Sequence, residues 1–183
     1  MSRLSICVYC GSRAGVDPAY AAAAREVGTL LGRMGAQLVY GGGRAGLMGI
    51  LADAALAAGA PVVGVIPQAL MSRELGHADI TELHVVETMH ERKKVMYMNS
   101  DAILVLPGGG GSLDEFFEVL TWRQLGLHAK PIVLLNTEGY WDPLLALIDR
   151  IIGEGFAESS LRGFVHSVPD VAALEPLLRA TLG

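Results

Sequence analysis

The sequence is poor in cysteine and lysine and contains no long apolar run. No apolar stretch approaches the roughly 18 to 20 residues that a helix needs to span a bilayer. The apolar segment 4–9 is also too short for the apolar region of a secretory signal peptide, so we expect a cytoplasmic protein. The 14 lysines and arginines are scattered along a chain of net charge −5. Nucleic acids and membrane surfaces are bound by basic patches, and without one we expect neither as a partner.

The two cysteines, Cys7 and Cys10, form a C-x-x-C pattern. Redox motifs of this type lie at the start of a helix, and zinc sites need further ligands nearby. Here the pattern falls in a segment that is predicted to be a strand, where residues three apart point to opposite faces. We therefore expect neither a redox function nor a metal site.

Length and composition predict one α/β domain over residues 1–183, because 51% apolar residues suffice for a sizeable core. Strands are predicted at 4–9, 37–40, 62–66, 83–86, 102–106, 132–135 and 165–168. Helices are predicted at 18–34, 47–58, 89–99, 113–126, 141–155 and 171–181. Most strand segments are continuous apolar runs, which is typical of strands covered on both faces. The alternation predicts a Rossmann-like three-layer sandwich with a mainly parallel sheet of about seven strands and a ligand at their carboxyl ends.

Three predicted strands end in turns of unusual composition, at 10–13 (CGSR), 41–46 (GGGRAG) and 107–112 (PGGGGS). Consecutive glycines let the backbone approach a ligand closely. Before a helix, their free N–H groups and the positive end of the helix dipole form a phosphate site. Tight packing of helix on strand would explain any one turn, but three turns at one edge of a sheet favour a ligand.

The second turn matches G-x-G-x-x-G at Gly41, Gly43 and Gly46, so a dinucleotide enzyme has to be considered. That motif belongs after a first strand and needs an acidic residue about twenty positions further on. Residues 65–68 (VIPQ) offer no carboxylate there, and the sequence contains no P-loop motif. A mononucleotide therefore fits better than NAD as the ligand, and the sequence does not indicate an ATP-hydrolysing P-loop protein.

Two segments have the form of a helix capping box, Ser112 with Glu115 and Thr88 with Glu91. Capping would fully explain Glu115, and a catalytic role is the alternative. The other box places Arg92 in the first turns of a helix, where a cation is unfavourable unless an anion compensates.

Residues 107–115 resemble the P-G-G-x-G-T-x-x-E motif of the Lonely Guy (LOG) family, cytokinin-activating phosphoribohydrolases long misnamed lysine decarboxylases. Residues 89–93 resemble the M-H-x-R-K segment of that family, and 39–49 match another of its stretches. The departure inside the signature is Ser112 in place of threonine, which keeps the hydroxyl.

The resemblance implies a homodimer that cleaves N6-substituted AMP into free base and ribose 5-phosphate, and we expect no cofactor. It implies that Arg92 and Glu115 are the catalytic pair. It also implies a substrate-binding set comprising Ser12, Gly42, Gly43, Glu74, Met89, Lys93, Gly108, Gly109, Gly110, Gly111, Ser112, Leu113, Asp114 and Thr121.

Breaking an N-glycosidic bond develops positive charge on the ribose and negative charge on the departing base. We expect Glu115 to stabilise the transition state or activate water. Arg92, which stays charged at any working pH, is expected to orient the substrate and balance charge. Asp114 or Glu118 could supply a second carboxylate, but both are equally well explained as helix-surface charges.

Two other functions have to be considered. Molybdenum-cofactor carrier proteins share a similar fold and glycine motif, although Arg92 and Glu115 together favour an enzyme. Amino-acid decarboxylation would need pyridoxal phosphate on a lysine or an equivalent electron sink. The chain has only three lysines, Lys93, Lys94 and Lys130, and none has a recognisable cofactor setting.

Overall fold

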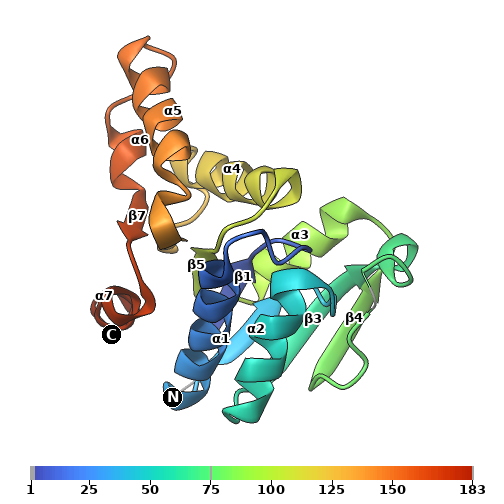
Figure 1. Ribbon diagram of the computed structural model, residues 1–183. Coiled ribbons are helices and arrows are strands. Elements are labelled where there is room, and N and C mark those ends of the chain that lie inside the picture. Colours follow the sequence, from blue (N-terminus) through green and yellow to red (C-terminus); the bar gives the residue numbers. More distant parts are fainter. Residues whose placement is uncertain (1–2, 75, 183) are drawn as a thin grey trace.

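A seven-stranded sheet forms the centre of the computed structural model, which describes residues 3–74 and 76–182 (Figure 1). Its strands are β1 (Ser5–Tyr9), β2 (Gln37–Tyr40), β3 (Val62–Pro67), β4 (Glu82–Val86), β5 (Ala102–Val105), β6 (Ile132–Leu135) and β7 (Val165–Val168). All neighbours pair in parallel, in the order β4-β3-β2-β1-β5-β6-β7. The predicted parallel sheet is therefore confirmed.

Helices cover both faces of the sheet, as the continuous apolar strands require. They are α1 (Pro18–Arg33), α2 (Gly46–Ala57), α3 (Met89–Met98), α4 (Gly110–Gln124), α5 (Asp142–Gly153), α6 (Ser160–Gly163) and α7 (Val171–Leu182). The short helix α6 and the 3-10 helices η1 (Gln68–Leu70) and η2 (Thr137–Gly139) were not predicted. Across residues 3–74 and 76–182, no helix has both the length and the apolar character to cross a membrane.

Alternate residues of the strands contribute to two separate hydrophobic cores, one on each face of the sheet. On β1, Ile6 and Val8 face the layer of α1, α2 and α7, whereas Cys7 and Tyr9 face α3, α4, α5 and α6. Cys10 packs partly against the first core, so the two cysteines lie on opposite faces as predicted, and both thiols are free. Burial raises the pKa of both thiols well above their usual range, which keeps them protonated and unreactive.

The order in which strands are added to the sheet reverses between β1 and β5. From β1 the chain adds β2, β3 and β4 on one side, and then returns to place β5 on the other side of β1. The loops after β1 and β5 therefore diverge, which leaves a crevice at the carboxyl ends of these central strands. This is the edge of the sheet at which the glycine-rich turns converge.

One of the two predicted capping boxes forms and the other does not. Thr88 accepts a hydrogen bond from the Glu91 N–H at 3.1 Å, and the Glu91 carboxylate accepts one from the Thr88 N–H at 3.0 Å. The Ser112–Glu115 box is wrong, because α4 begins at Gly110, three residues before the predicted start, with Gly109 as its N-cap. The chain turns into the helix directly after β5, so Ser112 lies inside the first turn and packs over Gly108.

We expect Gly28→Ala to destabilise the protein, because Gly28 is where α1 crosses α2. An added Cβ would lie 2.8 Å from both the Ala54 Cβ and the Ala55 amide nitrogen. Overpacking of this kind costs about 1–3 kcal/mol, more than the gain of up to about 1 kcal/mol in helix propensity.

Gly153 is the matched control, since the space around it in the last turn of α5 is open. Gly153→Ala should stabilise by up to about 1 kcal/mol. Urea unfolding midpoints that shift in the same direction for both variants would contradict this account of the α1–α2 contact.

Candidate functional site

A cavity of about 500 Å³ lies over the carboxyl ends of β1 and β5. Its walls come from the turns after β1, β2 and β5, from η1 with the segment that follows it, and from α3, α4 and the loop after β6. The predicted site residues that line it are Ser12, Glu74, Met89, Arg92, Gly108, Gly109, Gly110, Gly111, Ser112 and Glu115. The structure therefore brings together both predicted catalytic residues and most of the predicted binding residues.

The turn before α4 has the properties of an anion site. Its N-cap, Gly109, has no side chain, and no side chain caps the first turn of the helix. A Cβ added to Gly109, Gly110 or Gly111 would meet no atom within 4 Å, so packing does not require glycine at these positions. Free N–H groups at the positive end of a helix of this length attract a phosphate. The glycine run is therefore open to close approach by a ligand.

The glycines after β2 have a different role. A Cβ on Gly41 would collide with the guanidinium of Arg92, and Gly42 has a φ of +73°. The Gly42 carbonyl accepts a hydrogen bond from the His77 N–H at 2.9 Å, and the Arg44 N–H donates to the Glu74 carbonyl at 2.9 Å. Gly42 and Gly43 do not line the cavity; this turn holds in place the segment that carries Glu74.

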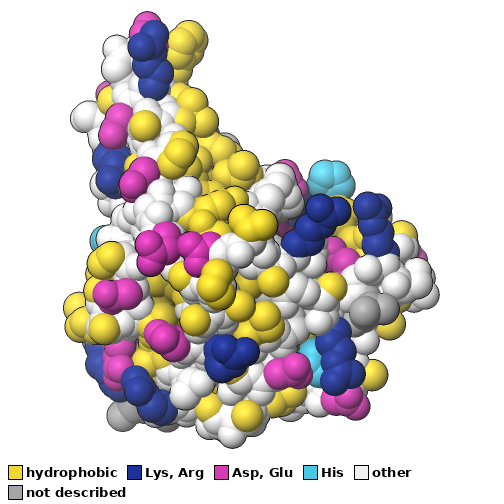
Figure 2. Space-filling view, in the orientation of Figure 1, with side chains coloured by type: hydrophobic (Ala, Val, Ile, Leu, Met, Phe, Trp, Pro, Cys, Tyr) yellow, Lys and Arg dark blue, Asp and Glu magenta, His cyan; other side chains and the backbone are white. Residues whose placement is uncertain are grey.

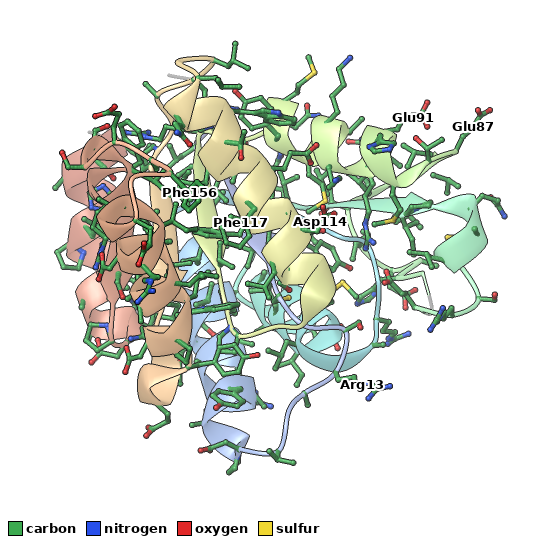
Figure 3. The ribbon with its side chains drawn as sticks, turned by 90° about the horizontal axis from the view of Figure 1, so that it is seen from above. Arg13, Glu87, Glu91, Asp114, Phe117 and Phe156 are labelled. Atoms are coloured by element: carbon green, nitrogen blue, oxygen red, sulfur yellow. The ribbon has the colours of Figure 1, made fainter. Side chains whose placement is uncertain are left out.

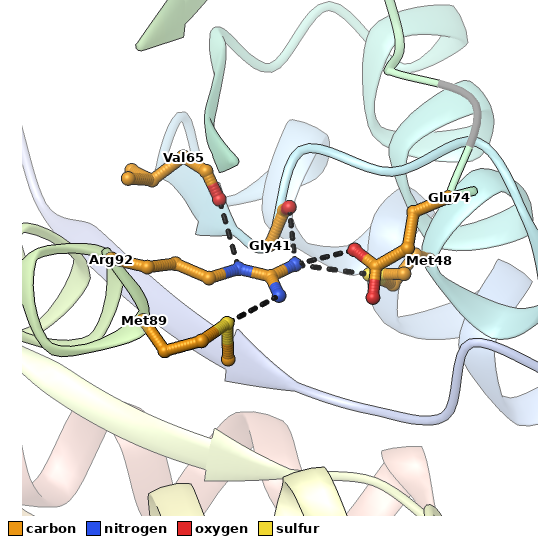
Figure 4. Close-up of polar contacts among 6 residues, drawn as sticks. All are labelled: Gly41, Met48, Val65, Glu74, Met89 and Arg92. Carbon is orange, nitrogen blue, oxygen red and sulfur yellow. Dashed lines mark hydrogen bonds and ion pairs between the residues drawn. The ribbon is translucent and has the colours of Figure 1, made fainter. Parts of the chain in front are cut away.

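Arg92 is almost completely buried, with 4% of its surface exposed, and its guanidinium is fixed on several sides (Figure 4). Nε donates to the Val65 carbonyl at 3.0 Å, and Nη2 donates to the Gly41 carbonyl at 2.5 Å. Nη2 also forms an ion pair with the Glu74 carboxylate at 2.8 Å. A buried charge is tolerated when it is paired and hydrogen-bonded in this way. The anion that compensates Arg92 near the start of α3 is therefore Glu74.

Glu115 lies in the second turn of α4 and lines the same cavity as Arg92. Burial raises the pKa of Glu115 to about 7, although the charge of Arg92 opposes this rise. The neighbouring carboxylates Asp114 and Glu74 raise it further. A carboxyl group that titrates near neutral pH is suited to proton transfer.

Apolar side chains surround the guanidinium on its cavity side. The sulfur atoms of Met48 and Met89 both lie 4.0 Å from guanidinium nitrogens of Arg92. Leu70 and Met96 also line the cavity. The cavity thus has an apolar region beside Arg92, as well as the polar turn at α4.

Six of the predicted binding residues lie outside the cavity lining, namely Gly42, Gly43, Lys93, Leu113, Asp114 and Thr121. Lys93 forms ion pairs with Asp114 and Glu118, each at 3.0 Å, which tie α3 to α4. Burial opposes its charge, but the hydrogen bonds and negative charges of Asp114 and Glu118 together outweigh burial and raise the pKa of Lys93. Asp114 points from α4 toward α3 (Figure 3). Binding roles for these residues stay predictions.

Sequence reasoning missed several lining residues, among them Tyr20 and Tyr140. Tyr140 could have been found, because it follows β6, and residues just beyond strand ends lie at this edge of the sheet. Tyr20 belongs to the first turn of α1, and no sequence signal distinguishes it from an ordinary helix residue.

An uncapped, glycine-rich helix N-terminus at the switch point of a parallel sheet defines a class of protein, the Rossmann-like proteins that bind phosphate-bearing ligands. Within it the chain belongs to the LOG family. The family model described as "Possible lysine decarboxylase" matches residues 48–177. The chain is 49% identical over 164 residues to the "Probable cytokinin riboside 5'-monophosphate phosphoribohydrolase LOGL1" of Oryza sativa subsp. japonica, covering 90% of this chain and 74% of that relative.

A second relative agrees. The chain is 47% identical over 169 residues to the "Cytokinin riboside 5'-monophosphate phosphoribohydrolase LOG1" of Arabidopsis thaliana, covering 92% of this chain and 79% of the relative. The resemblance inferred from the motifs is thereby confirmed.

Solved structures of molybdenum cofactor proteins share the fold. The carrier protein from Chlamydomonas reinhardtii matches with a TM-score of 0.74 at 22% identity, over 99% of both chains. The binding protein from Rippkaea orientalis matches with a TM-score of 0.76 at 18% identity, over 100% of this chain and 99% of that one. Likeness at this level of identity shows the fold alone and confirms the predicted α/β sandwich.

We expect Glu115→Gln to change how stability depends on pH. The pKa of Glu115 is about 7 in the folded protein against an ordinary value of 4.5, so between these values the folded state holds a proton that the unfolded state has released. The contribution of Glu115 to wild-type stability should therefore fall as the pH rises from 4.5 to 7, and glutamine removes this loss.

Urea unfolding at both ends of this range measures the effect. Relative to the wild type, the free energy of unfolding of the variant should increase by about 2 kcal/mol as the pH rises. A stability difference that is the same at both pH values would show that Glu115 titrates normally.

Proposed function

We propose that this protein hydrolyses the N-glycosidic bond of an adenosine 5′-monophosphate, plain or N6-substituted, and releases the free base and ribose 5-phosphate. One observation carries the proposal: Arg92 and Glu115 face the same cavity as the uncapped glycine turn of α4. The names of the relatives, cytokinin riboside 5′-monophosphate phosphoribohydrolases, support the same reaction.

The polar and apolar regions of the cavity suit the parts of such a substrate. The 5′-phosphate would bind the free N–H groups at the start of α4. The base would lie in the region lined by Met48, Leu70, Met89 and Met96. The ribose would then lie between them, within reach of Arg92 and Glu115.

In the reaction the C1′–N bond breaks and its electron pair leaves with the base. Water supplies a hydroxyl group to C1′ and a proton to the base. Glu115, with a pKa of about 7, can stabilise the positive charge on the ribose when ionised, or take the proton of the attacking water. Arg92 is fixed by the Gly41 and Val65 carbonyls, so it can orient the substrate and balance the negative charge.

We extend the proposal to a single-domain protein that acts as a homodimer in the cytoplasm. Met98 on α3 and Leu125 after α4 are exposed, 64% and 67%, and a partner would cover them. Hydrophobic side chains also lie along the right-hand side of the projection that α5 and α6 form above α4 (Figure 2). The free thiols of Cys7 and Cys10 fit a reducing compartment.

The two rival functions have less support. The molybdenum cofactor proteins share the fold but only 18% to 22% of the sequence. A decarboxylase would need a lysine in the cavity, but none of the three lysines lines it. Lys93 is bound by two carboxylates, Lys94 is exposed, and the Nζ of Lys130 donates to the Tyr97 carbonyl.

Chromatography of reactions with AMP and with isopentenyl-AMP tests the proposal. Equal amounts of free base and ribose 5-phosphate are expected from at least one of them, and the two kcat/KM values rank the bases. A folded protein that binds the nucleotide without cleaving it would overturn the hydrolase in favour of a carrier.

Glu115→Gln should fold normally and lose turnover by roughly 10²-fold or more, because the carboxylate that handles charge or a proton is gone. Glu87→Gln is the control, since Glu87 is exposed at the outer edge of the molecule (Figure 3). Near-normal turnover of the Glu115 variant would remove Glu115 from the catalytic pair.

A further inference from the structure

Tyr20 and Tyr140 form an aromatic pair in the cavity wall beside the glycine turn of α4. Their ring centroids lie 5.5 Å apart with the planes inclined by 74°. The ring centroids of Tyr140 and Trp141 lie 4.7 Å apart with the planes inclined by 83°. These two edge-to-face contacts favour the observed orientation of the Tyr140 ring.

This orientation places the Tyr140 hydroxyl against the phosphate-binding turn. The hydroxyl donates a hydrogen bond to the Gly108 carbonyl at 2.6 Å. Gly108 precedes Gly109, the N-cap of α4. The Gly11 N–H donates to the Pro107 carbonyl at 3.1 Å, so the turn is held at two successive carbonyl groups.

The loop that presents Tyr140 is itself tightly constrained. Glu138 has a φ of +53° and is the one non-glycine residue in the described parts of the chain with a positive φ. The Asn136 side chain accepts a hydrogen bond from the Trp141 N–H at 2.6 Å and donates to the Asp142 carboxylate at 2.7 Å. Strained backbone of this kind persists where its surroundings determine it, and such positions cluster at functional sites.

We propose that Tyr140 is a positioning residue for the phosphate group of the substrate, an inference that rests on the proposed function. Its hydroxyl fixes the Gly108 carbonyl, and the N–H groups of Gly110 and Gly111 are thereby held ready for the anion. A run of four glycines has many backbone conformations open to it, so ordering it in advance lowers the entropy lost when the phosphate binds. Tyr140 thus acts on phosphate binding and not on the chemistry at C1′.

Tyr140→Phe tests this proposal because it keeps the ring contacts and removes only the hydroxyl. The KM for the nucleotide and the calorimetric Kd for ribose 5-phosphate should both rise about five- to tenfold, the effect of one hydrogen bond. The value of kcat should stay within about twofold, and competitive inhibition by adenosine, which has no phosphate, should not change. Tyr97→Phe is the matched control, since Tyr97 is not a lining residue of the cavity.

Two results for Tyr140→Phe would overturn the proposal. One is an unchanged Kd for ribose 5-phosphate; the other is equally weakened binding of ribose 5-phosphate and adenosine, which would indicate a general loss of order in the cavity. Calorimetry separates this proposal from the hydrolase. If the wild type cleaves no nucleotide, yet ribose 5-phosphate alone binds the variant more weakly, the positioning role stands and the hydrolase fails. A wild type that does not bind ribose 5-phosphate would overturn both.

Discussion

The guanidinium of Arg92 is a buried charge, and several elements of the cavity depend on how it is held. A buried cation is costly unless its donors are satisfied and its charge is paired. The Gly41 carbonyl just after β2 and the Val65 carbonyl within β3 accept hydrogen bonds from Nη2 and Nε, and Glu74 supplies the pairing charge. This arrangement explains why residue 41 is glycine and why the segment after η1 lies against the turn that follows β2. The Arg92 side chain thereby holds the turn after β2, strand β3 and the segment after η1 around the cavity.

Glu115 completes the electrostatic arrangement. Its carboxyl group is influenced by Arg92, which favours ionisation, and by Asp114 and Glu74, which oppose it, while burial is the largest effect. The balance leaves its pKa at about 7, so small changes in the surroundings decide its protonation. A bound phosphate at the start of α4 would add negative charge to the same cavity. Arg92 and the α4 dipole are the groups that can compensate it.

The fold could be predicted closely because uninterrupted apolar runs mark strands covered on both faces. The predicted start of α4 is three residues too late. The Ser-x-x-Glu pattern after the glycine run has the form of a capping box, but the helix already begins at Gly110. The site could be predicted where a residue follows a strand end. The family resemblance implied binding roles for Asp114 and Lys93, which neighbour Glu115 and Arg92 in the sequence. Successive helix residues point about 100° apart, however, and both side chains lie outside the cavity lining.

A crystal structure of the Glu115→Gln variant with bound AMP tests the central claim most directly. The account predicts that the phosphate accepts hydrogen bonds from the N–H groups of Gly110 and Gly111, with C1′ beside residue 115 and the sugar in contact with Arg92. A phosphate bound elsewhere, for example between Arg13 and Arg73 at the outer rim, with C1′ away from residue 115, would contradict it.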